Sequence, residues 1–178
     1  LKSHYRWCET HQKLKTTIIS ALFAALICVA TMVVKIPTPL NGYINLGDCF
    51  VVLGAFLLGP VYGAVAGGLG SALADLLSGY TQYALGTFII KAGMAVVAAL
   101  IFKAFWSKIK ISSPIGAVCA EIVMVLGYFV YESIFLGYGL GAAGAIVGNC
   151  IQAVAGAVSS VLLYQALYAV PAIKKFAF

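Results

Sequence analysis

The stretch TTIISALFAALICVATMVV, residues 16–34, decides the fold class of this chain. It carries no charged side chain, and at about 1.5 Å per residue it is long enough to cross a hydrocarbon core roughly 30 Å thick. The whole chain shares this character, since 63% of its residues are apolar, 9% are charged and the mean hydropathy is +1.05. Too little polar surface remains to cover a water-soluble globule, so the composition predicts an integral membrane protein.

Further apolar runs predict five more membrane helices. The first span is expected over 16–35, and the polar connection after it, IPTPLNGYINLGD, is expected to be an ordered loop because it is rich in turn formers. Residues 49–77 are too many for one span and are interrupted at Gly59-Pro60, which predicts a short second helix and a third. Later spans are expected over 86–105, 114–136 and 142–170. The predicted fold is therefore an all-α bundle of six transmembrane helices over 16–170, between a polar leader (1–15) and a basic tail (171–178).

Basic residues gather at alternate ends of the predicted spans. They precede the first span, follow the fourth and close the chain, at Lys2, Arg6, Lys13, Lys15, Lys103, Lys108, Lys110, Lys174 and Lys175. Since positive charge is retained on the cytoplasmic side, this pattern predicts a multi-pass protein of six spans with both termini in the cytoplasm.

The chain lacks the motifs of the common membrane and nucleotide enzymes. It contains no GxxxxGK[ST] phosphate loop, no HExxH, no GxSxG and no filter sequence of the TVGYG type. Its five cysteines are scattered without a CxxC spacing, so no metal site and no cofactor is predicted. These observations favour a transport or capture protein over an enzyme.

Ionisable and polar side chains collect at one end of the predicted bundle. An ionisable group inside a membrane costs at least a few kcal/mol unless it is paired or hydrated, so each is a functional candidate. The predicted site, suited to a small polar ring, comprises Asn41, Tyr43, Asn45, Asp48, Asp75, Tyr80, Tyr83, Lys91, Tyr128, Glu132 and Asn149. Lys35, Gln82, Tyr131 and Gln152 are expected at the same end. The alternative is that the tyrosines form an interfacial belt and that Asp75 and Lys91 neutralise each other. Glu121 lies nearer the other end and is expected to make a helix–helix hydrogen bond or a partner contact.

Small residues line the expected third and sixth helices, which predicts close helix packing. A smaller patch of this kind lies on the first helix, where Ala21 and Ala25 are four residues apart and therefore on one face. Either the bundle itself or another protein could use it.

The segment KIPTPLNGYINLGDCFVVLGAFLLGPVYGAVAGGLGSALADLLSGY, residues 35–80, resembles the S components of energy-coupling factor (ECF) vitamin transporters. GYINLGD and GSALADLLSGY are its most specific parts, and the resemblance extends over about 14–170. It implies a six-helix bundle in a bacterial cell membrane that binds a vitamin or precursor near the outer face and docks onto a transmembrane coupling protein (the T component) with two ATPases. It also implies that Ala21 and Ala25 meet the coupling protein and that residues 39–48 form a lid.

The resemblance leaves several ligands open. Relatives bind riboflavin, hydroxymethylpyrimidine or pyridoxine, and the smaller rings are favoured because neither tryptophan, Trp7 or Trp106, is expected near the site to stack on a tricyclic ring. Two other classes of function remain as alternatives. A self-sufficient secondary carrier would transport its substrate alone, and a structural assembly subunit would bind no small molecule.

Overall fold

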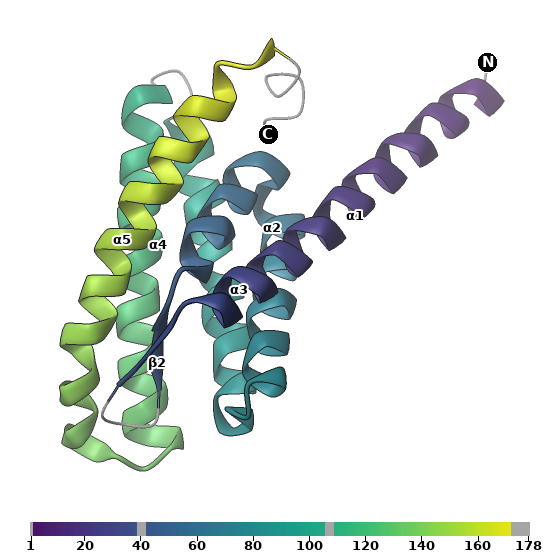
Figure 1. Cartoon of the computed structure of the whole chain (residues 1–178). Helices are drawn as coiled ribbons and strands as arrows, with labels where there is room; N and C mark the ends of the chain where they lie inside the picture. The colour runs from purple at the N-terminus through teal and green to yellow at the C-terminus, as the bar shows by residue number, and fades with distance from the viewer. Residues whose placement is uncertain (1, 39–41, 106–108, 172–178) are drawn as a thin grey trace.

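The computed structural model describes residues 2–38, 42–105 and 109–171, and these residues are mostly helical (Figure 1). The elements are α1 (Lys2–Val33), β1 (Lys35–Pro37), β2 (Tyr43–Asn45), α2 (Gly47–Leu77), α3 (Thr81–Ala104), α4 (Ile109–Val130), the π-helix η2 (Tyr131–Phe135), the 3-10 helix η3 (Gly139–Ala142) and α5 (Ala143–Tyr168). Within the described part of the chain, five helices are long and apolar enough to cross a membrane. The predicted class, a helical membrane bundle, is confirmed, whereas the predicted count was six.

The observed and predicted numbers of spans differ because α2 is one element where two helices were predicted. It is interrupted at Gly59. Gly59 has φ 78° and ψ −177°, a conformation that is essentially restricted to glycine, and Pro60 follows it. A Cβ placed on Gly63 would lie 2.8 Å from the Cα of Ala55, and one on Gly67 would lie 3.0 Å from Val51. These pairs are centred on Gly59, so the two halves of α2 pack against each other as a helical hairpin, and the ribbon reverses there in Figure 1.

The first half of α2 is short. From Gly47 to Leu58 it is only about 18 Å long, at 1.5 Å per residue, and it begins in the middle of the bundle. The remaining space toward one end is occupied by the antiparallel hairpin of β1 and β2, in which Lys35 pairs with Asn45 and Pro37 with Tyr43 (Figure 1). The polar connection is thus ordered, as expected, but its two strands were not predicted.

Several helix boundaries also differ from the predictions. α1 begins at Lys2 and extends through the polar leader, and α3 begins at Thr81, five residues before the predicted start at 86. Ser112 and Ser113, placed in a connection by the sequence, are fully buried within α4. The fifth span continues beyond α4 through η2. Hydropathy locates the centre of a span well and its polar ends poorly.

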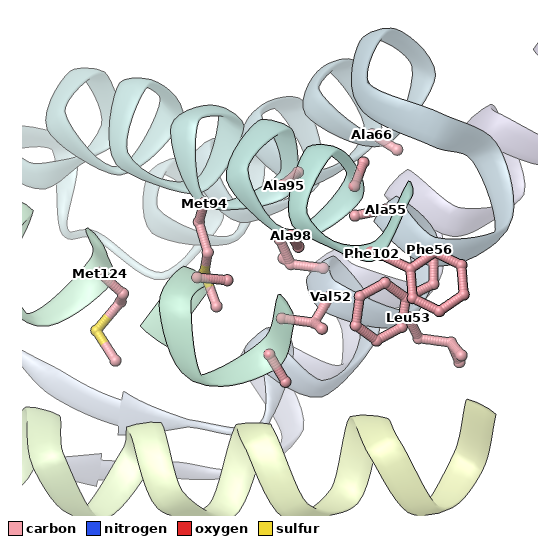
Figure 2. Close-up of a cluster of buried hydrophobic side chains, with 14 of the residues drawn as sticks. Val52, Leu53, Ala55, Phe56, Ala66, Met94, Ala95, Ala98, Phe102 and Met124 are labelled. Atoms are coloured by element: carbon pink, nitrogen blue, oxygen red, sulfur yellow. The ribbon is translucent and has the colours of Figure 1, made fainter. Parts of the chain in front are cut away.

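Apolar side chains fill the half of the bundle away from the β-hairpin. Val52 and Phe56 of α2 belong to the same continuous core as Met94 and Phe102 of α3 (Figure 2). The rings of Phe56 and Phe102 are 4.6 Å apart, and both lie edge-on to Tyr164 of α5, at 5.4 and 5.1 Å. This half of the bundle is therefore closed by packed rings.

Glycine allows α1 and α3 to approach the second half of α2 closely, as the small-residue pattern predicts. The space that a Cβ on Gly70 would need is occupied by the backbone carbonyl of Ala24, and a Cβ on Gly68 would lie 3.0 Å from the carbonyl oxygen of Phe88. Helices in a membrane associate through such close packing, because lipid is as apolar as the side chains.

The connections divide between the two ends of the bundle (Figure 1). The β-hairpin, the turn between α2 and α3 and the turn between η2 and α5 lie at one end, which we call the hairpin end. The start of α1, the reversal at Gly59, the end of α3 and the end of α5 lie at the other.

Candidate functional site

A polar cavity opens at the hairpin end, in the space left by the short first half of α2. The space between its lining residues is about 480 Å³, including open solvent at the mouth. The lining comes from the β-hairpin and all five long helices: Thr31, Thr38, Gly42, Tyr43, Asn45, Ser71, Asp75, Tyr83, Thr87, Lys91, Tyr128, Glu132, Asn149 and Gln152.

Lys91, on α3, lies between the cavity and a buried carboxylate. Its ammonium group forms an ion pair with Asp48, at the start of α2, and both side chains are almost fully buried. The pairing of Lys91 with Asp75, considered from the sequence, is therefore wrong. Since the charge of Lys91 is neutralised by a group behind the cavity wall, little of it is available to a ligand.

Gln152 of α5 connects this ion pair to the β-hairpin. Its amide nitrogen donates to Asp48 Oδ2 at 2.6 Å, and its amide oxygen accepts from the backbone N–H of Asn45 at 2.7 Å. The side chain of Asn45 in turn accepts from the N–H of Gly47 at 2.8 Å, in the first turn of α2. One buried glutamine thus fixes the inner end of the hairpin to the helices.

Two tyrosine–carboxylate pairs stand on the cavity wall. The hydroxyl of Tyr43 donates to Asp75 Oδ1 at 2.5 Å, and that of Tyr83 donates to Glu132 Oε1 at 3.2 Å. Burial and the adjacent Asp75 carboxylate raise the pKa of Tyr43 above its ordinary value, so this phenol stays protonated and remains a donor. Each carboxyl group is held through one oxygen.

Aromatic rings provide flat surfaces in and around the cavity. Tyr128 shares a hydrogen bond with Thr87 at 3.0 Å, and the ammonium group of Lys91 lies 5.4 Å from its ring centre. Tyr43 also packs against Tyr80, outside the cavity lining, with ring centres 4.6 Å apart. Rings beside hydrogen-bonding groups suit a flat polar ligand.

Eight of the eleven residues predicted for the site line the cavity: Tyr43, Asn45, Asp75, Tyr83, Lys91, Tyr128, Glu132 and Asn149. Asp48 and Tyr80 lie directly behind lining residues, and Asn41 falls outside the described residues. Residues absent from the predicted set are Thr31, Thr38, Gly42, Ser71 and Thr87, whereas Gln152, which the sequence also places at this end, lines the cavity. Hydroxyls in apolar helices often bond to their own backbone and give no signal of a site, whereas an amide such as Gln152 in an apolar run does.

Glu121 of α4 differs from its prediction. It is 3% exposed, and neither carboxyl oxygen has a hydrogen-bond partner among the described residues, so the expected helix–helix hydrogen bond is not present there. It is also close to the predicted site, because Glu121 and Asp48 both occupy the space that a Cβ on Gly156 would need.

Ala21 and Ala25 both lie exposed on α1. This helix is the longest in the described chain and is largely uncovered along its apolar span. The pair is therefore placed where another helix could reach it, and it is not used in packing within the bundle.

The cavity offers groups suited to binding a ligand. Among the described residues there is no group of three or more histidine, cysteine, aspartate or glutamate side chains that could hold a metal ion. What the arrangement provides is hydrogen-bond acceptors, hydroxyls and aromatic faces, partly enclosed at one end of a membrane bundle.

Comparison with known families gives a match that covers most of the chain. The model of the ECF-type riboflavin transporter, S component, matches residues 11–169. Among solved structures, one titled "Structure and mechanism of the S component of a bacterial ECF transporter" superposes with a TM-score of 0.71 at 24% identity, covering 88% of this chain and 97% of the other. At that identity the likeness concerns the fold.

Two curated relatives are similar in sequence. An uncharacterized protein from Pyrococcus woesei is 41% identical over 131 residues, which are 73% of this chain and 86% of that protein. The thiamine precursor transporter HmpT of Lactococcus lactis is 28% identical over 155 residues, 86% of this chain and 87% of its own length.

Proposed function

The chain belongs to the family of S components of ECF-type transporters, and we propose that it captures a small vitamin or vitamin precursor at the outer face of the membrane. Membership makes it a multi-pass membrane protein and a transport subunit rather than an enzyme. The observation that carries the proposal is the polar cavity, which is enclosed by the β-hairpin and lined by eight residues that the sequence singles out.

We propose that the hairpin end faces outward, with six membrane segments and both termini in the cytoplasm. The reversal at Gly59 supports this arrangement, because it divides α2 into two antiparallel segments. Lys103 lies at the end of α3, at the same end of the bundle as the start of α1, where the leader carries further basic residues. That basic end is the cytoplasmic one by the positive-inside rule.

The favoured ligand is a small nitrogen heterocycle, hydroxymethylpyrimidine or pyridoxine. A relative named as a thiamine precursor transporter supports the pyrimidine. The described lining supports a small ring as well, since its aromatic faces are tyrosines with no tryptophan. Riboflavin is the second candidate, because the matching family's description names it.

Delivery is proposed to require partners, namely a transmembrane coupling protein and two ATPases. Among the described residues, the packed rings of Phe56, Phe102 and Tyr164 occupy the half of the bundle opposite the cavity. This favours reorientation of the whole subunit over a self-sufficient carrier. The exposed pair Ala21 and Ala25 is the proposed docking surface.

Binding to the purified protein tests the proposal. Isothermal titration with hydroxymethylpyrimidine, pyridoxine and riboflavin should give saturable one-to-one binding of at least one vitamin, and Asn149→Ala in the lining should weaken it about 5- to 150-fold. Failure of all three to bind the folded protein would remove the proposed function.

A further inference from the structure

The cavity has an excess of hydrogen-bond acceptors, and this excess identifies what the ligand must present. Asp75 Oδ2 and Glu132 Oε2 are buried without a hydrogen-bond partner, although the other oxygen of each carboxyl accepts from a tyrosine. Thr87, whose hydroxyl is engaged with Tyr128, also faces Asp75. Both free oxygens belong to residues that line the cavity.

Other atoms of the same kind gather around the cavity. Within the described part of the chain, eight buried side-chain oxygens lack a hydrogen-bond partner. Four of them belong to lining residues: the two carboxyl oxygens just named, Thr31 Oγ1 and Ser71 Oγ. A buried polar atom costs free energy unless a ligand or water satisfies it. Such clustering is expected of a binding site whose ligand completes the hydrogen bonds.

The charges around the cavity favour a donor ligand over an anion. Lys91 is the only cationic side chain of the described lining, and its ion pair with Asp48 neutralises it. Asp75 and Glu132 form no ion pair among the described residues, and Lys35, whose charge also acts on Asp75, lies outside the lining and donates to Ser78. A ligand phosphate or carboxylate would therefore meet two carboxyl groups in a lining whose one ammonium group is already paired, in surroundings that screen charge weakly.

We infer that Asp75 and Glu132 select a neutral or cationic heterocycle that donates hydrogen bonds from two of its positions, and that phosphorylated forms of the same vitamin are rejected. This inference rests on the proposed function, since it concerns the same cavity. The amino and hydroxymethyl groups of an aminopyrimidine are donors of the required kind. A ligand without donors would displace water from both carboxyl groups and would not replace the hydrogen bonds that the water made.

Each candidate vitamin carries a hydroxymethyl-type alcohol whose phosphate ester provides a matched anion. The pairs are hydroxymethylpyrimidine with its monophosphate, pyridoxine with pyridoxine 5′-phosphate, and riboflavin with flavin mononucleotide. Titration of the wild-type protein first identifies the vitamin that binds. Its phosphate ester is expected to bind at least 100-fold more weakly.

Amide variants then separate charge from shape. Asp75→Asn and Glu132→Gln preserve size but remove an acceptor, and each is expected to weaken vitamin binding about 10- to 150-fold. In the double variant, the preference for the vitamin over its ester should fall at least tenfold, because the repulsive charges are gone. Glu9→Gln is the control, since it makes the same change in the leader part of α1, at the end of the bundle away from the cavity, and should leave both affinities unchanged.

The outcomes distinguish the inference from the function beneath it. If the wild-type protein binds none of the three vitamins, both fail. If it binds one, but both single variants bind it with wild-type affinity, only the inference fails. An unaltered preference in the double variant would likewise overturn it, because size would then explain the rejection of the ester.

Discussion

Removing the ammonium group of Lys91 should destabilise the protein, and replacing Asp48 should restore the loss. The side chains are 2% and 0% exposed, so Lys91→Met leaves a carboxylate buried and without its cation. Breaking a buried ion pair in this way costs about 3 to 5 kcal/mol. At about 2 to 4 °C per kcal/mol for a chain of this length, the melting temperature should fall by about 6 to 20 °C.

The assay is thermal unfolding of the ligand-free protein in detergent, with two second-site variants compared. Asp48→Asn added to Lys91→Met should recover most of the loss, since the amide oxygen still accepts from Gln152, whereas Asp75→Asn should recover none. Lys103→Met, an exposed lysine at the end of α3, is the control and should shift stability by less than about 1 kcal/mol. Recovery by Asp75→Asn and not by Asp48→Asn would refute the pairing on which the cavity's charge balance depends.

Three further predictions address the backbone, the docking surface and the topology. Gly59→Ala should lower the free energy of unfolding by about 1 to 3 kcal/mol, because residues with a Cβ rarely adopt φ 78° with ψ −177°. Gly93→Ala is the control and should be tolerated, since the nearest atom to its Cβ would lie 4.0 Å away. Equal effects of the two changes would contradict the reversal at Gly59. Ala21→Trp should abolish co-purification with the coupling protein while vitamin affinity stays within about twofold, and a wild-type yield would exclude this surface. In a cysteine-free background, Ser78→Cys should react with an impermeant thiol reagent from outside and Lys103→Cys only from the cytoplasm; the reverse pattern would invert the topology.

The helical segments could be predicted from hydropathy because a membrane-spanning helix requires a long apolar run, and such a run can be recognised in the sequence itself. Even the reversal within α2 could be read, since Gly59-Pro60 removes a backbone donor and supplies a residue able to adopt positive φ. The β-hairpin could not be predicted in this way. Each strand has three residues, too few for an alternating pattern, and their pairing depends on the space beside the short half of α2.

The membership of the cavity could be predicted better than its pairings. Polar residues in apolar surroundings mark a site wherever they lie, which explains why Tyr83, Glu132 and Asn149 were found. Which carboxylate pairs with Lys91 depends on how far α2 is displaced along the bundle relative to α3. Because α2 begins mid-bundle, Asp48 lies level with Lys91 and near Glu121, a displacement that no local pattern encodes.

Vitamin uptake into proteoliposomes tests most directly the claim that this chain is a capture subunit. Vesicles containing the chain alone should bind the vitamin identified by titration without accumulating it. Vesicles that also contain the coupling protein and both ATPases, with ATP on the ATPase side, should concentrate it, and Ala21→Trp should abolish that uptake. Accumulation by the chain alone, driven by an ion gradient, would contradict the account and make the protein a self-sufficient carrier.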